Sequence, residues 1–278
     1  MLRLVTHPAV EPLHLDEAKR HLVVEHDDHN AVIASLIVAA RRHIEERARH
    51  AMVGQQWELT LDQFPFGCIP AGCTRDTEPG WIMLMRGPVQ SVEAISYIDP
   101  AGAPQTLPAG DYTVDLYSQP ARIMPAYGKY WPSTRAQLNA VSVRFRVGDA
   151  TPFSVNATTN VITAQGRSLT TAETVRLSNS GGSLPAGLNA ETDYYVIEAS
   201  GGSGKLALTS GGSAIDITDA GLGLHFLGVI PQDLKHALLF VLAHFYENRE
   251  PVNIGNIVNP LPLTVEALIG PYRQIEVY

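Results

Sequence analysis

Two segments near the start of the chain carry apolar residues three and four positions apart, which is the spacing of one face of a helix. The first, residues 15–25, predicts a short helix. A longer helix is predicted from the acidic pair Asp27 and Asp28 to about Met52, because negative charge is favourable at a helix N-terminus, and Gly54 ends it. The inward positions are Leu15, Ala18 and Leu22 in the first helix and Ile33, Leu36, Ile37, Ala40, Ile44, Ala48 and Ala51 in the second.

Downstream, apolar and polar residues alternate, which is the period of a half-buried strand. Trp57, Leu59 and Leu61 alternate with polar residues, and so do the apolar residues of the segment 140–147, which Gly148 terminates. Further strands are predicted in WIMLM (81–85), VEAISYID (92–99) and DYTVDL (111–116), with a turn at 99–102.

The composition changes sharply at about Thr151 and changes back after Gly228. This segment is rich in Gly, Ser, Thr, Asn and Ala, and its three basic and six acidic residues give it a formal charge of −3. Turn residues separate five predicted strands, at Val161–Ala164, Thr174–Leu177, Asp193–Glu198, Lys205–Thr209 and Ile215–Thr218. We therefore expect an α+β fold in which residues 1–150 and 229–278 form one discontinuous domain, with helices and a small antiparallel sheet, and residues 151–228 form an inserted all-β domain.

A third helix is predicted from Pro231 to the stop signal at Asn248–Pro251. One side of it is apolar, and so is much of the other, where Leu239, Phe240 and Tyr246 lie. A helix that is apolar nearly all round is buried on both sides. Either the sheet or a neighbouring copy covers the second side, and a neighbouring copy would make the protein an oligomer.

Two other segments are candidate contact surfaces. The loop MPAYGKYWPST (124–134) carries Tyr127, Tyr130 and Trp131, and we expect it to pack on another subunit, the alternative being that it folds back on its own sheet. After a short predicted helix at 264–270, Ile275 and Val277 alternate with polar residues as in an edge strand. We expect the tail Arg273, Ile275, Val277 and Tyr278 to add a strand to a neighbour's sheet.

Composition and charge restrict the class of protein. Hydrophobic residues make up 45% of the 278 residues and charged residues 17%, which is a globular composition. A net charge of −8 disfavours tight binding of nucleic acid through its phosphates. No apolar run is long enough to span a membrane and the N-terminus does not resemble a signal peptide, so we expect a protein kept in a cytoplasm, with Cys68 and Cys73 reduced.

Candidate chemistry is sparse. His236 and His244 lie eight positions apart on one predicted helix and cannot share a metal ion, and the His244–Glu247 pair has no partner motif elsewhere in the chain. We find no nucleophile elbow or phosphate-binding glycine loop, and we expect no enzyme activity, no metal and no cofactor. Four arginines in the segment RRHIEERAR (41–49) alternate with Glu45 and Glu46, which predicts a solvated or interface salt-bridge face.

Five segments in order resemble one known family. They are HLDEAKRHLVVEHDDHNAVIASLIVAARRHIEERA, QQWELTLDQFP, GPVQSVEAISYIDPAGAPQTLPAGDYTVDL, IPQDLKHALLFVLAHFYENREPV and LPLTVEALIGPYR. Together they resemble the head-tail connector proteins (adaptor or head-completion proteins) of long-tailed bacteriophages, over residues 1–150 and 229–278. The segment 151–228 departs from the family pattern, in which a short loop joins the last strand to the helix that proline begins.

The resemblance implies a non-enzymatic virion protein of the head-tail neck, assembled in the host cytoplasm. Such a protein would form a ring, expected to be twelve-fold, of neighbouring copies of itself. The expected partners are the portal protein on one side and stopper or tail proteins on the other, with the genomic DNA passing through without specific binding, and no membrane. Two alternatives stay open: a different neck or tail-completion component, such as a stopper, and an enzyme or carbohydrate-binding module in the segment 151–228.

Overall fold

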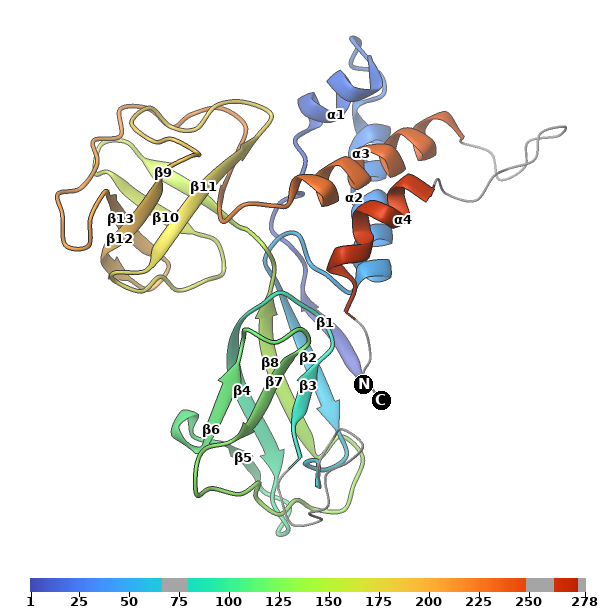
Figure 1. Cartoon of the computed structure of the whole chain (residues 1–278), viewed down its shortest axis with the longest axis vertical. Coiled ribbons are helices and arrows are strands. Elements are labelled where there is room, and N and C mark those ends of the chain that lie inside the picture. The colour runs from blue at the N-terminus through green and yellow to red at the C-terminus, as the bar shows by residue number, and fades with distance from the viewer. Residues whose placement is uncertain (67–79, 249–262, 275–278) are drawn as a thin grey trace, which may run out of the picture.

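The computed structural model describes residues 1–66, 80–248 and 263–274. These residues form the helices α1 (Leu15–Leu22), α2 (Asn30–Ala48), α3 (Gln232–Glu247) and α4 (Leu263–Ile269), together with fourteen strands. Figure 1 shows three parts: the helices, a pair of facing sheets, and a barrel beside them.

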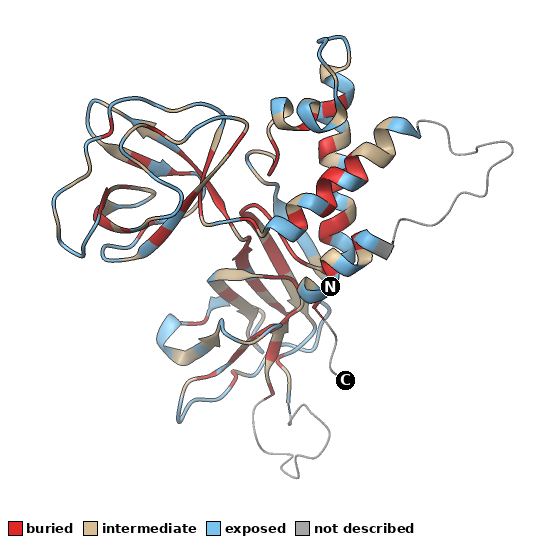
Figure 2. Ribbon diagram, turned by 45° about the horizontal axis from the view of Figure 1, so that its top comes forward, coloured by how far each residue is buried: buried red, intermediate tan, exposed pale blue. Residues whose placement is uncertain are grey.

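The helices pack mainly on one another. The predicted stripe of α2 is buried at Ile33, Ile37, Ala40, Ile44 and Ala48, and it contacts α3, as Figure 2 shows by the buried colour on the facing sides. The helix is shorter than predicted, because Arg49 adopts a left-handed conformation (φ 52°) that ends it. Residues 51–53 follow the helix and are fully buried. They form the crossing from α2 to the next strand, β2 (Gln55–Leu61). Gly54 therefore belongs to this crossing and does not end the helix.

Two antiparallel sheets face each other across a shared core. The five-stranded sheet has the order β1-β2-β8-β4-β5 and the three-stranded sheet the order β3-β7-β6. Ile95, Val143 and Phe145 from the first sheet and Leu84 and Ile123 from the second belong to one buried cluster. The strands are β1 (Leu2–Thr6), β2 (Gln55–Leu61), β3 (Ile82–Leu84), β4 (Val89–Ile98), β5 (Pro104–Thr106), β6 (Tyr112–Asp115), β7 (Ala121–Pro125) and β8 (Val141–Val147). All five predicted strands before residue 151 are confirmed, while β1, β5 and β7 were not predicted.

Residues 151–227 form a closed barrel, with the strand order β10-β13-β12-β11-β14-β9. Its strands are β9 (Thr151–Asn156), β10 (Val161–Ala164), β11 (Thr174–Ser180), β12 (Asp193–Ser200), β13 (Ser203–Ala207) and β14 (Leu224–Leu227). Four of the five predicted strands are confirmed. The fifth, at Ile215–Thr218, is wrong: the segment buries Ile217 in the barrel core but forms no strand. The unpredicted strands β9 and β14 pair with each other, so the chain enters and leaves the barrel at adjacent points.

The described residues contain three separate hydrophobic cores: one among the helices, one between the sheets and one inside the barrel. Residues 1–150 and 229–278 thus contribute two cores, where we expected one. Phe226 of β14 and Ile230 reach into the helical core, so the barrel and the helices share a boundary there. The division into a discontinuous domain and an inserted domain stays a prediction.

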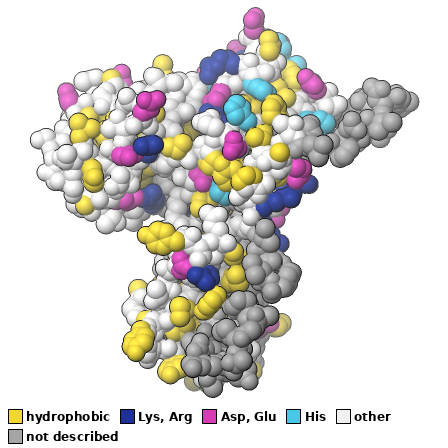
Figure 3. Space-filling model, viewed as in Figure 1, with side chains coloured by type: hydrophobic (Ala, Val, Ile, Leu, Met, Phe, Trp, Pro, Cys, Tyr) yellow, Lys and Arg dark blue, Asp and Glu magenta, His cyan; other side chains and the backbone are white. Residues whose placement is uncertain are grey.

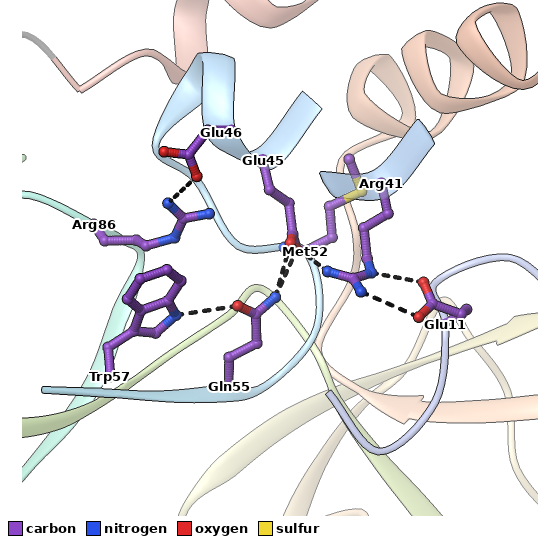
Figure 4. A network of polar contacts seen from close by, with 8 residues as sticks. All are labelled: Glu11, Arg41, Glu45, Glu46, Met52, Gln55, Trp57 and Arg86. Carbon is purple, nitrogen blue, oxygen red and sulfur yellow. Dashed lines mark hydrogen bonds and ion pairs between the residues drawn. The ribbon is translucent and has the colours of Figure 1, made fainter. Parts of the chain in front are cut away.

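A buried polar network joins the helices to the sheets, as Figure 4 shows. The Glu45 carboxylate accepts hydrogen bonds from Arg41 Nη1 (2.6 Å), from the backbone N–H of Met52 (2.9 Å) and from Gln55 Nε2 (2.9 Å). Arg41 also donates to Glu11 from Nε (2.6 Å) and Nη2 (3.2 Å). Arg41 and Glu45 are 3% and 2% exposed, so the prediction of a solvated salt-bridge face is wrong for this pair. A buried pair this well hydrogen-bonded is costly to break by removing one partner.

Replacing Arg41 should therefore destabilise the protein strongly. Arg41→Gln is expected to lower the free energy of unfolding by about 3–5 kcal/mol, because it leaves the buried Glu45 carboxylate without its charged partner. The matched control is Arg42→Gln, the same substitution at the exposed next residue, where we expect a change within about 0.5 kcal/mol. Urea unfolding followed by circular dichroism measures both variants. Equal losses of unfolding free energy in the two variants would show that the network does not stabilise the connection between the helices and the sheets.

Candidate interaction surfaces

The candidate residues of the sequence lie on several separate surfaces of the described structure. No group of three or more His, Cys, Asp or Glu side chains in the described residues is placed to hold a metal ion, and Cys68 and Cys73 lie outside these residues. No described helix is long and apolar enough to cross a membrane. His236 is exposed on α3 and His244 hydrogen-bonds with Asn248, at 3.3 Å between Nδ1 and Nδ2.

The predicted aromatic loop divides into two kinds of residue. Tyr127 and Tyr130, just after β7, are 106% and 76% exposed. Trp131 is 8% exposed, stacks on Phe64 with ring centroids 4.8 Å apart, and donates its Nε1–H to the backbone oxygen of Gly80 at 2.8 Å. Because its ring and its N–H are both satisfied within the subunit, Trp131 is a core residue, and its placement in an interface is corrected. The two tyrosines remain candidates.

Further exposed side chains extend this tyrosine surface. Tyr117 (101%) lies in the turn between β6 and β7, and Met124 (44%) lies on the outer face of β7. Beside Met124, the guanidinium of Arg122 lies 4.6 Å above the ring of Trp81. We call the exposed residues on β7 and in the segments on either side of it, Tyr117, Met124, Tyr127 and Tyr130, the tyrosine face. Sequence reasoning did not single out Tyr117, which lies in the turn before β7, and it assigned Met124 to the start of a loop although Met124 belongs to β7.

The second apolar side of α3 is only partly covered. Leu239 is 8% exposed and belongs to the helical core, so it is not available to a partner. Phe240 is 42% exposed and makes an edge contact with His21, at a centroid distance of 6.5 Å. Tyr246 is half-buried and shares a hydrogen bond of 2.6 Å with His29 Nδ1. In Figure 3, hydrophobic and histidine side chains lie side by side over the helices. Helices, and not the sheet, cover the buried side of α3, and Phe240 stays open.

The C-terminal segment is anchored within the subunit up to residue 274. Arg273 forms an ion pair with Glu266 of α4, at 2.7 Å. Gln274 is 9% exposed, and its backbone N–H donates to the carbonyl of Ala48 at 3.1 Å. The predicted helix at 264–270 is confirmed as α4. Ile275, Val277 and Tyr278 lie outside the described residues, so the predicted edge strand is untested.

The two adjacent tyrosines of β12 differ in burial. We predicted that Tyr194 and Tyr195 point to opposite faces of a strand with one of them in the core. Tyr194 is 2% exposed, and its hydroxyl accepts a hydrogen bond of 2.7 Å from the N–H of Asn189. Tyr195 is half-buried. The prediction is confirmed, and neither ring stands free as a flat surface.

The barrel is fixed to the helices by a second polar cluster. Ser180 at the end of β11 is 2% exposed, accepts from the backbone N–H of His14 (2.8 Å) and donates to Glu17 of α1 (2.7 Å). Lys235 of α3 forms an ion pair of 2.7 Å with the other Glu17 oxygen. Burial alone would raise the pKa of Glu17, but the hydrogen bonds from Lys235 and Ser180 outweigh it and hold that pKa below its ordinary value.

Comparisons with known proteins give likeness only at the level of structure. No protein-family model and no curated protein matches the chain. Three solved structures match over 100% of this chain and 97% of theirs, each at 18% identity. They are the neck of an empty gene transfer agent (GTA) particle computed with C6 symmetry (TM-score 0.57), the virion of a native GTA particle (0.56), and the neck of a native GTA particle computed with C12 symmetry (0.54). At this identity the likeness shows a shared fold, and it spans the barrel as well as the helices and sheets.

The cluster around Glu17 predicts a pH dependence. A carboxyl whose pKa is lower in the folded chain stabilises the fold above its unfolded pKa, and that contribution is lost as the pH falls through the folded value. Glu17→Gln is expected to cost about 1–2 kcal/mol at pH 7, and the difference from wild type should shrink as the pH falls from about 5 towards 3. Unfolding in urea at several pH values measures it, with Glu25→Gln, an exposed acid just after α1, as control. A difference that stays constant with pH would contradict the assignment.

Proposed function

We propose that this protein is a structural subunit of the neck of a phage-like particle, where copies of it form a ring between the portal and the tail. One observation carries the proposal: the whole chain shares its fold with subunits of GTA necks and virions, over almost the full length of both chains. The ordered resemblance of five sequence segments to phage head-tail connectors supports the same role independently.

The ring is proposed to contain twelve copies, as the family resemblance implies. One GTA neck that shares the fold was computed with C12 symmetry and another with C6 symmetry. A ring of this kind closes through heterologous contacts, in which one surface of a copy meets a different surface of the next. The exposed tyrosine face and the open side of α3 around Phe240 are two such surfaces, and we assign them to subunit or portal contacts.

The proposed ring conducts the genome without gripping it. Each phosphate that Lys or Arg neutralises adds affinity, and tight binding would oppose passage. The chain has 28 acidic against 20 basic residues, and several arginines are already engaged by carboxylates within the subunit, among them Arg41, Arg122 and Arg273. We further propose that the protein has no enzymatic activity, that it assembles in the host cytoplasm, and that stopper or tail proteins bind its other side.

A stopper or tail-completion role is the alternative. The fold likeness is compatible with both roles, because the matching structures are two whole necks and a virion. Electron microscopy of the purified protein, alone and mixed with its portal protein, separates the two. Closed rings on the portal axis support the portal-side role, and a folded monomer that forms no ring in either sample would favour the alternative.

The tyrosine face should be needed for assembly but not for folding. Tyr127→Ala combined with Tyr130→Ala is expected to abolish or strongly reduce ring formation, because both side chains are exposed in the single subunit. Its thermal stability should stay at the wild-type value. Leu208→Ala, at an exposed apolar residue of the barrel (63%), is the control and should leave assembly intact. Full assembly of the double variant would reject these two tyrosines as contacts. Trp131 is unsuitable for this test, since its replacement would open the core.

The C-terminal tail gives a separate test of portal binding. Deleting residues 275–278 is expected to abolish docking on the portal while leaving the fold intact, as strand addition to a neighbour requires. The deletion begins at Ile275 because Gln274 is buried and hydrogen-bonded to α2. A co-sedimentation assay with the portal protein, with urea unfolding to check the fold, measures the outcome. Retained docking would remove the tail from the interface.

A further inference from the structure

A groove of about 710 Å³ lies where the five-stranded sheet meets the barrel. Gln90 and Glu93 of β4 and Arg146 of β8 line it from the sheet, and Gly166, Arg167 and Glu173 line it from the barrel. The pairing of β4 with β8 is irregular at two points here, between Val89 and Ser91 and between Val92 and Ala94. Such bulges redirect side chains, and they put Gln90 and Glu93 on the groove.

The guanidinium of Arg146 is held in a slot between two glycines. A Cβ atom added to Gly54 would lie 3.1 Å from Arg146 Nη2, and one added to Gly166 would lie 2.8 Å from it. Gly166 has a φ of +73°, which L side chains rarely adopt. A side chain at either position would crowd the guanidinium, so the two glycines give Arg146 its room.

Within the described residues the donors of Arg146 are largely unused. Arg146 is 8% exposed, and its Nη2 donates a hydrogen bond of 3.2 Å to the carbonyl of Gln165. Nε is buried and has no hydrogen-bond partner. Arginine has five N–H donors, and one that is buried without a partner, as at Nε, is costly. By contrast Arg144, two residues earlier on the same face of β8, is 48% exposed and pairs with Glu58 at 3.4 Å.

The other charges in the groove do not satisfy Arg146. The Glu173 carboxylate pairs with Arg167, and Glu93 accepts a short hydrogen bond from Gln56. Burial lowers the pKa of Arg146, although the charge of Glu93 opposes the shift, and burial together with the charge of Arg146 lowers that of Arg167. Among the described residues Arg146 therefore has no carboxylate partner in the groove, whereas Arg167 has one, and the two glutamates would repel a polyanion such as DNA.

The same groove is lined by Gln90, which carries an unused acceptor. Gln90 Nε2 donates to the carbonyl of Gly148 at 2.7 Å, which fixes the orientation of the amide. Its Oε1 is buried without a hydrogen-bond partner among the described residues. A site with free donors and a free acceptor is complementary to a carboxylate carried on a peptide, which also brings N–H groups.

We propose that this groove is a binding site for a singly charged carboxylate, which Arg146 receives through its free N–H donors. The source of the carboxylate is either an acidic side chain of a second copy of this chain or a free carboxylate anion. A planar guanidinium binds a carboxylate through two parallel hydrogen bonds, and the match of one charge to one unpaired cation favours a monoanion. The first source rests on the proposed ring. The chain has a surplus of acidic residues for it, such as Asp28, whose side chain is 91% exposed.

The first arm of the test uses the full-length protein and acetate as the probe. Sodium acetate replaces sodium chloride at constant ionic strength, up to about 0.1 M, where a ligand with a millimolar dissociation constant saturates. Nitrogen-proton NMR follows the arginine Nε–H signals. We expect a saturable shift of the Arg146 signal, which Arg146→Gln removes and Arg144→Gln leaves unchanged. The wild-type titration decides this arm even if Arg146→Gln fails to fold, because through-bond correlations assign the signal.

The second arm identifies the source. Sedimentation velocity over a range of protein concentrations compares self-association of wild type, Arg146→Gln and the control Arg144→Gln. If a second copy supplies the carboxylate, Arg146→Gln should raise the concentration needed for half-assembly about tenfold or more, and acetate should compete with assembly of the wild type.

Each outcome decides a claim. An acetate response with weakened association assigns the site to a neighbouring copy, and an acetate response with unchanged association assigns it to a free carboxylate. The absence of any acetate response overturns the proposal, whatever the association shows. Rings that form equally well without Arg146 leave the proposed ring intact and reject only its use of this groove.

Discussion

The Glu45 carboxylate is the constraint on which the arrangement of the chain depends. It binds Arg41 within α2, the backbone of Met52 after the helix, and Gln55 at the start of β2. A buried carboxylate needs all of these donors, so the turn from helix to sheet has little freedom. Two other segments are hydrogen-bonded to this turn. The Gly87 carbonyl, between β3 and β4, accepts from the N–H of Ala51 (2.7 Å), and the Ala150 carbonyl, just before β9, accepts from the N–H of Gly54 (2.9 Å). The helices, both sheets and the entry to the barrel thus meet at one place.

The barrel is positioned by contacts on two sides, in addition to its two chain connections. Its strands β9 and β14 are adjacent, so the connections alone would act as a single hinge. Ser180 binds the helices through His14 and Glu17, while the turn at Gln165 and Gly166 packs on Arg146 of the sheet. These contacts lie on different elements and together oppose rotation about the hinge. They also explain why a polar groove, and not an apolar core, separates the barrel from the sheet.

The periodic patterns predicted most of the helices and strands. They could not predict which segments, distant in the sequence, contact one another in the fold. The alternation from Val141 to Val147 and the stripe from Ile33 to Ala48 report local geometry, and both are confirmed. The burial of Arg41 could have been predicted from the sequence, because Arg41 lies four positions after Ile37 and three before Ile44 on the inward stripe. Trp131 and Tyr130 are adjacent in one loop, and contacts with Phe64 and Gly80, both distant in the sequence, bury Trp131. For the same reason the sequence does not single out Arg146. Its surroundings form only when a turn of the barrel packs on it.

The two outer surfaces of the paired sheets differ in chemistry, and this difference bears on the kind of assembly the subunit can form. Residues on the outer face of the five-stranded sheet are polar and charged, including Arg3, Glu58 and Arg144 in one ion-pair network. The outer face of the three-stranded sheet, on the opposite side, presents the exposed tyrosines and Met124. An isologous dimer joins a patch to its own copy and needs one self-complementary surface, while a closed ring joins two different surfaces. A subunit with an aromatic side and a polar side presents two different surfaces, which is the arrangement that the proposed ring requires.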